Sequence, residues 1–519
     1  MDKITILWAD DEIEILKPHI LFLNDKGYDI IPAISGDEAL DHIKDNKNIQ
    51  GVLLDENMPG ITGLETLLKI KQGNPNLPVI MITKSEEEHI MEDAIGGKIA
   101  DYLIKPVNPN QILLSLKKAL DNKRLVSEKT NTEYRKEFAQ IGITLSDKLS
   151  LEEWIELYKK LVYWELELDQ VQDKSMYEVL TMQKADANSQ FFKFIEKNYI
   201  NWLGGKESNA PVMSHTLLKN KFFPLLGSAK EKYFLIVIDN LRFDQWKIIE
   251  PIINNYYKTK SEELFFSILP TATQYARNAI FSGLLPSEME KRHPDLWKND
   301  HDEGGKNLHE EEFLKAQLTR NGKDLKVNYT KITNYNSGKK LVDNFNNLLS
   351  ADLNVIVYNF VDMLSHARTD MEVIRELAEN EAAYRSITKS WFEHSPLHEI
   401  IKRLRDKDIK LVITTDHGTV HVKEPTKVLG DKNVNSNLRY KQGKALDYNP
   451  KEVFEIKNPA DAFLPKANVS TRYIFAKEYK FFAYPNNYNH YVNYYKNTFQ
   501  HGGISLEEMI IPYIVLEPK

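Results

Sequence analysis

The sequence contains no cysteine in its 519 residues. This absence excludes disulfides, iron–sulfur clusters, cysteine-ligated zinc and thiol nucleophiles. Any metal ion must therefore be held by histidine, by carboxylates or by hydroxyl oxygens, which are ligands of hard and borderline cations.

Long hydrophobic runs are also missing from the sequence. No stretch reaches the roughly 18 consecutive apolar residues that a bilayer-spanning helix requires. The start, Met1-Asp2-Lys3-Ile4, leads directly into a short apolar segment without the basic region of a secretory leader. We therefore expect no membrane span and a cytoplasmic protein.

Neither sign of charge dominates the chain. Lys and Arg total 68 and Asp and Glu total 75, which gives a formal net charge of -7. This balance argues against a protein that binds DNA through a global basic surface. Hydrophobic residues at 42% and aromatic residues at 10% are enough for folded cores. The length predicts about three or four folding units.

The first 120 residues alternate between short apolar runs and amphipathic helical patterns. The runs are 4–8, 28–33, 51–54, 79–83 and 101–104. Apolar strands separated by helices are typical of a parallel sheet covered on both faces, with its polar site at the carboxyl ends of the strands. Polar residues follow these strands, namely Asp10, Asp11 and Glu12, then Asp55, Thr83 and Lys105.

Three of these residues, Asp10, Asp11 and Asp55, are expected to converge at one sheet edge. Their charges would repel one another unless a divalent cation neutralised them, and an all-oxygen set of ligands suits Mg²⁺. A carboxylate beside Mg²⁺ and a lysine is suited to accept a phosphoryl group.

The residues Ala9-Asp10-Asp11-Glu12, Leu54-Asp55-Glu56-Asn57-Met58-Pro59-Gly60 and Lys105-Pro106 resemble a response-regulator receiver domain over about residues 1 to 120. The resemblance implies that Asp55 is the phosphoacceptor of a two-component system. It also implies a set of supporting roles: Mg²⁺ held by Asp10, Asp11, Asp55 and the backbone of Asn57, Lys105 paired with the phosphoryl group, and Thr83 with Tyr102 as the switch pair. Lys84 departs from the small residue usual after Thr83, which bears on the access of water to the acyl phosphate.

The middle of the chain shows helical periodicity and no strand-like alternation. Helices are predicted near 112–125, 175–183 and 188–202, and an aromatic stripe follows the first of them at Trp154, Leu157, Tyr158, Leu161 and Trp164. This spacing favours a packed helical core over a partner-binding face. We predict a helical bundle connector at 123–225, between a receiver at 1–122 and a third domain at 226–519.

The C-terminal half again places polar residues after apolar runs. Asp239, Asp362 and Asp416-His417 follow such runs, His366 lies four residues after Asp362, and His501 precedes two glycines. These six side chains offer nitrogen and oxygen ligands for two transition-metal ions about 3.5 to 4 Å apart, an arrangement used in phosphoryl transfer.

A hydroxyl nucleophile is expected beside such a metal pair. Pro270-Thr271-Ala272-Thr273 precedes a helical run, so these threonines lie at a helix N-terminus, where backbone N–H groups favour anions. Coordination to a metal would lower the hydroxyl pKa and activate it. Both Thr271 and Thr273 are candidates.

The motifs Val237-Ile238-Asp239-Asn240-Leu241-Arg242, Pro270-Thr271-Ala272-Thr273, Thr415-Asp416-His417-Gly418 and His501-Gly502-Gly503 resemble the alkaline phosphatase superfamily, more narrowly its PglZ branch. The resemblance covers about residues 230 to 519. It implies two zinc ions, one held by Asp362, His366 and His501 and the other by Asp239, Asp416 and His417. Register with the nucleotide phosphodiesterase branch favours Thr273 as nucleophile, and Thr271 stays open. Asn240 departs from the glycine common after this aspartate.

The segment 430–448 is rich in basic residues, with Lys432, Arg439, Lys441 and Lys444, and it lacks clear periodicity. We interpret it as a mobile basic loop, which either is simply solvated or covers a polyanionic substrate.

The expected architecture is an α/β multidomain protein with a flavodoxin-like receiver, a helical bundle connector and an alkaline-phosphatase-like α/β domain. This order resembles response regulators associated with type IX secretion, which implies a sensor histidine kinase as partner.

We expect phosphorylation of Asp55, through homodimerisation, to gate a zinc-dependent phosphodiesterase or phosphatase, with a linear or cyclic oligonucleotide as the best-fitting substrate. The main alternative is a non-catalytic scaffold that binds a sigma factor or a secretion component. A phosphomutase is a weaker third hypothesis, because no sugar-phosphate clamp is evident.

Overall fold

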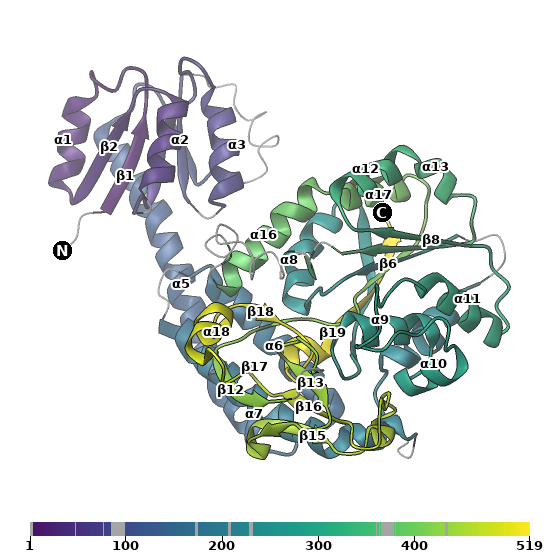
Figure 1. Cartoon of the computed structure of the whole chain (residues 1–519). Helices are drawn as coiled ribbons and strands as arrows, with labels where there is room; N and C mark the ends of the chain where they lie inside the picture. Colours follow the sequence, from purple (N-terminus) through teal and green to yellow (C-terminus); the bar gives the residue numbers. More distant parts are fainter. Residues whose placement is uncertain are drawn as a thin grey trace. The chain divides into compact units, whose positions relative to one another are not determined.

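The computed structural model describes residues 4–46, 48–75, 77–84, 99–171, 175–205, 209–227, 232–359, 361–362, 364, 378, 380–430 and 434–519, and only the backbone of 121–128. The chain forms two compact units, drawn in Figure 1. The first comprises Met1–Glu137 and Glu167–Met176, and the second comprises Phe138–Leu166 and Tyr177–Lys519.

The first unit contains a five-stranded parallel sheet in the order β2-β1-β3-β4-β5. Its strands are β1 (Ile4–Ala9), β2 (Tyr28–Ala33), β3 (Gly51–Asp55), β4 (Val79–Thr83) and β5 (Asp101–Ile104). All five strands predicted from the apolar runs are present, and the order is that of a flavodoxin-like sheet. The strand order changes direction beside β1 and β3, so the carboxyl ends of these strands form the site.

Helices cover both faces of this sheet. The helices are α1 (Lys17–Asp25), α2 (Gly36–Asp45), α3 (Gly63–Gly73) and the start of α5 (Pro109–Ser146). One buried cluster includes Ala39 of α2 and Leu67 of α3, and the other includes Leu23 of α1 and Leu116 of α5. A capping box of Thr62 and Glu65 begins α3 directly after the loop that follows β3.

The second unit is built on a six-stranded mixed sheet in the order β7-β19-β10-β6-β9-β8. Its strands are β6 (Tyr233–Ile238), β7 (Tyr257–Phe266), β8 (Val327–Ile332), β9 (Leu353–Tyr358), β10 (Leu411–Thr414) and β19 (Ile510–Pro518). The strand β19 runs antiparallel to both of its neighbours, whereas β10, β6, β9 and β8 are parallel. The carboxyl ends of β6, β9 and β10 therefore lie at one edge of the sheet.

Helices and short strands surround this sheet. The helices of this unit after β6 are α8 (Phe243–Ile253), α9 (Thr273–Ser282), α10 (Pro286–Arg292), α11 (Glu310–Arg320), α12 (Tyr335–Asp343), α13 (Phe345–Leu348), α16 (Glu381–His394), α17 (Pro396–Arg405), α18 (Tyr488–Tyr495) and α19 (Leu506–Met509). The small sheets contain β11 (Val420–His421) with β18 (Phe499–Gln500), β14 (Asp447–Tyr448) with β12 (Glu424–Leu429) and β17 (Lys480–Ala483), and β13 (Tyr440–Gly443) with β16 (Arg472–Ala476) and β15 (Val453–Ile456).

The segment predicted as a mobile basic loop is partly ordered, and that interpretation is wrong for its centre. Tyr440–Gly443 forms β13, paired with β16. Arg439 is buried and forms an ion pair with Glu508, at 2.5 Å. Its charge is therefore neutralised inside the protein. Sequence periodicity did not predict this short strand, because only four of its residues pair with β16.

The connector is helical, as predicted, and contains the C-terminal part of α5 together with α6 (Leu151–Asp169) and α7 (Ser175–Leu203). Trp154, Tyr158 and Trp164 are buried, which confirms the aromatic stripe as core. The ring of Trp154 lies 5.3 Å from Phe191 of α7, and Phe191 lies 6.2 Å from Phe266 of β7. The helix α7 therefore packs against β7 of the six-stranded sheet, and α6 packs against α7.

Among the described residues, no helix combines the length and apolar character needed to cross a bilayer. The helix α5 runs without a break across the predicted 122/123 boundary, and the two boundaries between the three domains stay predictions.

Candidate functional site

The receiver pocket collects charged side chains from three strand ends. Asp10 follows β1, Asp55 ends β3 and Lys105 follows β5. Lys105 Nζ lies 2.9 Å from Asp10 Oδ2 and 3.1 Å from Asp55 Oδ2. Oxygen atoms of Asp10, Asp11 and Asp55 all lie within 4.8 Å of one another.

The electrostatics of this pocket fit a divalent cation. Burial raises the pKa of Asp55, the charges of Asp10 and Asp11 raise it further, and Lys105 opposes both effects. Asp55 Oδ1 is buried and accepts no hydrogen bond. A buried carboxylate oxygen without a donor is costly unless a cation approaches it. Because Asp11 is exposed, a bound Mg²⁺ could keep some of its water ligands.

The predicted switch residues lie beside this pocket. The buried Thr83 donates its Oγ1 hydrogen to Glu56 Oε2 at 2.6 Å. Tyr102 is half-buried on β5, and Lys84 and Asn57 are exposed. Sequence reasoning did not single out Glu56, although it follows Asp55 directly and therefore had to lie at the same strand end.

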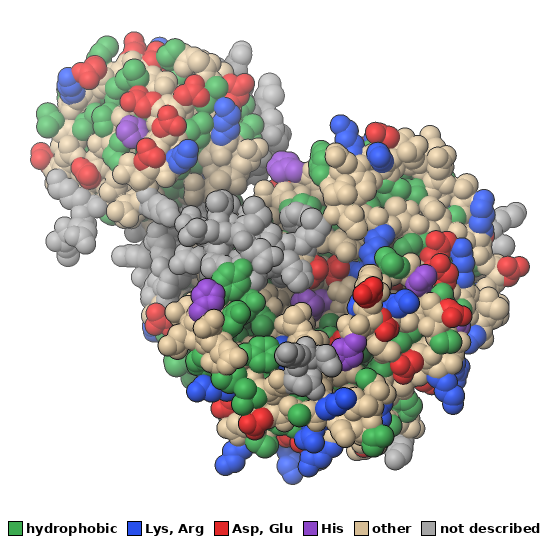
Figure 2. All heavy atoms as spheres, viewed as in Figure 1, with side chains coloured by type: hydrophobic (Ala, Val, Ile, Leu, Met, Phe, Trp, Pro, Cys, Tyr) green, Lys and Arg blue, Asp and Glu red, His purple; other side chains and the backbone are tan. Residues whose placement is uncertain are grey.

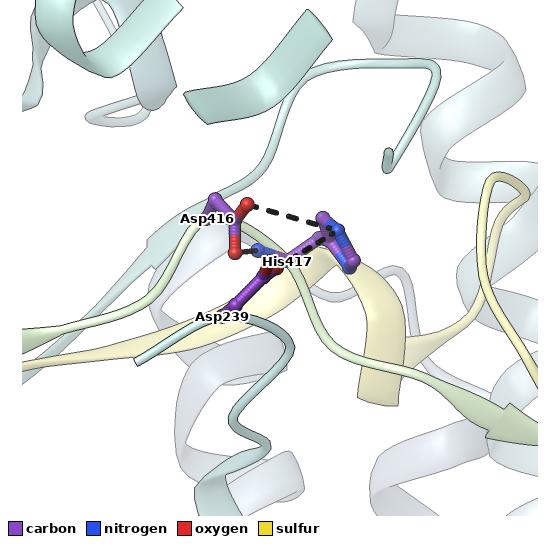
Figure 3. A group of neighbouring side chains, drawn as sticks. All are labelled: Asp239, Asp416 and His417. Atoms are coloured by element: carbon purple, nitrogen blue, oxygen red, sulfur yellow. Dashed lines mark hydrogen bonds and ion pairs between the residues drawn. The ribbon is translucent and has the colours of Figure 1, made fainter. Parts of the chain in front are cut away.

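The second pocket lies at the carboxyl edge of the six-stranded sheet. Asp239 follows β6, and Asp416 with His417 follows β10, the strand beside it. His417 Nε2 lies 3.9 Å from Asp239 Oδ1 and 3.8 Å from Asp416 Oδ2. Figure 3 shows the three side chains turned toward one another, and all three are buried.

Backbone carbonyls orient both histidines of this pocket. His417 Nδ1 lies 3.1 Å from the Gly418 carbonyl, and His501 Nδ1 lies 3.1 Å from the Thr271 carbonyl. A carbonyl can only accept, so each Nδ1 carries the proton and each Nε2 presents its lone pair. This is how histidine ligands of metals are commonly held. The two rings stack with centroids 4.3 Å apart.

The donor set of Asp239, Asp416 and His417 fits a transition-metal ion. Their ligand atoms lie within 4.8 Å of one another, and the buried Asp239 Oδ2 and Asp416 Oδ2 make no aligned hydrogen bond. Burial raises the pKa of Asp239 to about 6, and the charge of Arg277 opposes this rise. Two carboxylates and one imidazole form a set that zinc accepts.

The second predicted ligand set is partly visible. His501 Nε2 lies 3.6 Å from Asp362 Oδ1, so the structure brings these two side chains together. His366 lies outside the described residues. The stacking of His501 on His417 places the two predicted ligand sets next to each other.

The two candidate threonines have different surroundings. Thr273 is the first residue of α9, and its Oγ1 lies 3.1 Å from His417 Nε2 and 3.4 Å from Asp239 Oδ1. Thr271 Oγ1 instead donates to the Gly503 carbonyl at 2.9 Å and accepts from the Gly502 N–H at 3.0 Å. The Thr273 hydroxyl therefore faces the candidate metal-ligand atoms of Asp239 and His417. The Thr271 hydroxyl instead holds the loop after His501 in place through its two hydrogen bonds.

A buried arginine, Arg277, was not identified from the sequence. It lies one turn after Thr273 on α9, with Nη1 at 2.7 Å from Asp239 Oδ2 and at 3.7 Å from Asp416 Oδ2. Its Nε forms an ion pair with Glu310 at 2.5 Å. The spacing of four residues from Thr273 was the available signal, because such residues share a helix face.

Close backbone approaches explain the glycines of the metal motifs. A Cβ on Gly418 would meet the Glu507 carbonyl at 2.0 Å, and one on Gly503 would meet the Ala476 carbonyl at 2.5 Å. Asn240 has a φ of 63°, and its N–H donates to Asp416 Oδ1 at 3.2 Å. The left-handed conformation explains why asparagine can stand where glycine is common.

Comparisons with protein families match three consecutive parts of the chain. The response regulator receiver domain matches residues 6–117, the PorX response regulator linker domain matches 124–203, and the BREX system PglZ alkaline phosphatase-like domain matches 217–516. The PglZ match alone covers more than half of the chain.

Curated relatives match over a shorter region. The transcriptional regulatory protein ZraR of Escherichia coli O157:H7 is 30% identical over 141 residues, which is 27% of this chain and 32% of that protein. A cyclic di-GMP phosphodiesterase of Thermotoga maritima is 28% identical over 119 residues, covering 23% of this chain and 32% of the relative. The chain thus spans about a third of the length of these relatives.

Solved structures match a similar share of the chain. A receiver domain protein from Clostridium thermocellum is 30% identical, covers 23% of this chain and 97% of that chain, and has a TM-score of 0.22. The response regulator TrrA from Thermotoga maritima, solved with Mg²⁺ and BeF, is 32% identical, with coverages of 22% and 98% and a TM-score of 0.21.

The receiver implies a phosphodonor such as a histidine kinase, and the large C-terminal domain indicates a hydrolase of the phosphatase superfamily. With its receiver, PorX-type linker and effector domain in this order, the chain belongs to the PglZ alkaline phosphatase-like family as a PorX-type response regulator.

Proposed function

We propose that phosphorylation of Asp55 in this response regulator gates a zinc-dependent phosphodiesterase located in the PglZ domain. The observation that carries this proposal is the position of Thr273. A hydroxyl at the first position of a helix, 3.1 Å from His417 Nε2 and 3.4 Å from Asp239 Oδ1, is placed to attack a phosphorus atom beside a metal.

Two zinc ions are assigned to two neighbouring ligand sets. Asp239, Asp416 and His417 would hold one ion, and Asp362, His501 and His366 would hold the other, with His366 assigned from its sequence spacing. When bound, the metal supplies Lewis-acid stabilisation of the phosphoryl oxygens and lowers the pKa of the attacking hydroxyl. The receiver carboxylates Asp10, Asp11 and Asp55 would hold Mg²⁺.

The protein's own groups account for the rest of the reaction. Thr273 Oγ loses its proton to water and forms a bond to phosphorus, while the bond from phosphorus to the leaving oxygen breaks and that oxygen takes up a proton to leave as the alcohol. The first backbone N–H groups of α9 have no carbonyl partner one turn earlier, so they stabilise negative charge on the phosphoryl oxygens. Water then hydrolyses the phosphothreonine, which restores the Thr273 hydroxyl and releases a phosphomonoester. Thr271, already bonded to Gly502 and Gly503, positions the loop that carries His501.

Gating requires that the effector be more active in one state of the receiver than in the other. We assign this difference to phosphorylation-dependent homodimerisation, with a sensor histidine kinase as the phosphodonor. A linear or cyclic oligonucleotide is the substrate class that fits a phosphodiesterase in a signalling protein, and type IX secretion is the proposed process. A sigma factor or a secretion component remains a proposed downstream partner.

Turnover of bis(4-nitrophenyl) phosphate by the zinc-loaded full chain, with and without beryllofluoride, tests this function. We expect turnover that beryllofluoride increases, and a loss of this increase in Asp55→Asn. A protein that binds zinc stoichiometrically but hydrolyses no phosphodiester, phosphomonoester or sulfate ester would instead be a scaffold.

A further inference from the structure

One surface of the effector domain differs from the rest of this acidic chain. From residue 479 to residue 505 the sequence contains no aspartate or glutamate, although it contains Lys480 and Lys496 and nine tyrosines and phenylalanines. The helix α18 lies inside this stretch and reads Tyr-Asn-His-Tyr-Val-Asn-Tyr-Tyr. None of its residues is fully buried.

The rings of α18 form two columns along the helix. Tyr491 and Tyr495 have centroids 6.2 Å apart and planes 11° apart, and His490 and Tyr494 have centroids 6.3 Å apart and planes 21° apart. Residues four apart share a helix face, which explains the columns. Tyr491 is 38% exposed, and Figure 2 shows hydrophobic side chains gathered at the surface over α18. We call His490, Tyr491, Tyr494 and Tyr495 the α18 aromatic face.

Lysines accompany the tyrosines of this stretch. Lys427 Nζ lies 4.8 Å from the ring centre of Tyr488, and Lys423 Nζ lies 5.1 Å from that of Tyr479. Neither lysine has a carboxylate partner among the described residues. The neighbouring carboxylate of Glu424 is itself paired with Lys480, at 3.0 Å.

The α18 aromatic face is connected to the metal pocket by a short paired strand. The helix ends at Tyr495, β18 follows at Phe499–Gln500, and His501 comes next. Val420 of β11 pairs with Gln500, and β11 begins three residues after His417. Six extended residues span at most about 20 Å, so the face lies within reach of a short chain whose phosphate occupies the metal pocket.

Exposed aromatic rings interleaved with unpaired lysines are the elements that bind single-stranded nucleic acid. Bases stack on the rings whatever their sequence, and lysines attract the phosphates. The stretch 479–505 itself contributes no acidic side chain that would repel a polyanion, and the neighbouring Glu424 is paired with Lys480. Core packing explains part of the helix, because Tyr488, Val492 and Tyr495 pack against a buried cluster that includes Val420 and Phe481. It does not explain Tyr491, which is 38% exposed.

We propose that the α18 aromatic face, with Lys423 and Lys427, binds the bases and phosphates of a single-stranded oligonucleotide whose scissile phosphodiester lies at Thr273. This inference rests on the proposed phosphodiesterase function and names the part of the protein that selects an oligonucleotide over a small diester.

The test compares a 5′-fluorescein-labelled hexauridylate with bis(4-nitrophenyl) phosphate as substrates of the zinc-loaded full chain. In the double variant Tyr491→Leu with Tyr494→Leu, which keeps apolar bulk and removes the rings, KM for the hexanucleotide should rise at least about tenfold, the loss expected for about one stacked base. The kcat for both substrates and the KM for the small diester should stay unchanged.

Tyr491→Phe with Tyr494→Phe should retain hexanucleotide binding, because the ring faces remain. Tyr335→Leu is the matched control, since Tyr335 is 64% exposed on α12.

Fluorescence anisotropy of the same hexanucleotide on a Thr273→Ala background separates this inference from the proposed function. Binding that weakens at least about tenfold in the Leu variant and not in the Tyr335→Leu control supports the face, even if the wild type hydrolyses no diester. Equal binding by wild type and Leu variant, or no binding by either, would overturn it. If neither protein binds the hexanucleotide, the α18 aromatic face would be assigned to binding of a protein partner instead.

Discussion

The two acidic pockets of this protein follow the same rule of placement and differ in how they are held. Both put aspartates at the carboxyl ends of parallel strands, Asp10 and Asp55 in the receiver and Asp239 and Asp416 in the effector. The receiver pocket has an exposed aspartate, Asp11, and a lysine with 14% side-chain exposure. In the effector pocket Asp239, Asp416 and His417 are buried, as is the cation, Arg277, whereas Thr273 and His501 are half-buried.

This difference suits the two tasks that we propose for these pockets. A phosphoacceptor must be reached by a protein phosphodonor, so its pocket has to be open on one side. A catalytic pocket gains from exclusion of water, because electrostatic interactions are stronger in a low-dielectric site. Burial then requires more partners for each charge, and Glu310, Glu508 and Arg439 around the effector pocket are themselves buried and paired.

The largest expected effect concerns Thr273, the proposed hydroxyl nucleophile of the effector pocket. Thr273→Ala should lower kcat for bis(4-nitrophenyl) phosphate by about 10³-fold or more, since loss of a nucleophile removes the covalent route. Zinc content by atomic absorption and beryllofluoride-induced dimerisation should match the wild type. The matched variant is Thr271→Ser, which keeps the hydroxyl that bonds Gly502 and Gly503 and should retain activity. Full activity in Thr273→Ala would show that Thr273 is not the nucleophile.

The second effect concerns the cation in each pocket. Arg277→Met leaves Asp239 and Glu310 buried with fewer partners, so the unfolding free energy of the zinc-free protein should fall by about 3–5 kcal/mol. Lys105→Met should cost less, because water reaches its pocket. Urea unfolding measures both, and Arg405→Met, an exposed pair with Asp406, is the control at about 0–0.5 kcal/mol. Equal losses for Arg277→Met and Lys105→Met would contradict the contrast between a buried and an open pocket.

The third effect is the pH dependence of zinc binding. Burial raises the pKa of Asp239 to about 6 in the metal-free protein, so below that pH a proton competes with the metal. Zinc affinity should therefore weaken as pH falls through 6, by about tenfold per pH unit, and level off above it. Calorimetric titration with zinc between pH 5 and 8, in several buffers, measures this. An affinity that is flat across this range would show that Asp239 is not protonated there or is not a ligand.

The smallest effect lies in the receiver switch. Thr83 donates to Glu56 at 2.6 Å, so the phosphoryl group has to compete with the Glu56 carboxylate for this hydroxyl. Glu56→Gln weakens that competitor and should shift the equilibrium toward the activated receiver by about 1 kcal/mol, or roughly fivefold. Sedimentation with limiting beryllofluoride measures the shift in assembly. Glu12→Gln, at an exposed acid near the same pocket, is the control and should leave the equilibrium unchanged. If Glu56→Gln behaves like that control, the bond does not restrain the switch.

Much of the fold was predictable because its signals are local. The five receiver strands and the helical connector follow from apolar runs and helical periodicity, and both agree with the structure. The ligand candidates followed from the same reasoning, since a residue after a buried parallel strand must lie at the sheet edge. The buried polar contacts between distant segments were not predictable in this way. Arg439 and Glu508 are 69 residues apart, and Asn188 and Glu507 are 319 apart.

The difference between Thr271 and Thr273 shows where sequence reasoning ended. Both hydroxyls precede the same helix, and no local rule separates them. The two threonines differ because Thr271 Oγ1 forms hydrogen bonds with the backbone of Gly502 and Gly503, more than 200 residues later. Thr273 Oγ1 instead lies beside His417. A hydrogen bond from so distant a segment depends on the whole sheet being assembled.

By itself, the sequence determined which chemistry is possible in this protein. The absence of cysteine and the polar residues after apolar strands limited the metal sites to carboxylate and imidazole, and periodicity determined where strands and helices form. Only the tertiary structure decided which groups meet. It placed Thr273 and Arg277 beside Asp239, and it left Tyr491 of α18 exposed while Tyr488 and Tyr495 pack against a buried cluster. The physical reason is that secondary structure depends on neighbours along the chain, whereas burial and ion pairing depend on neighbours in space.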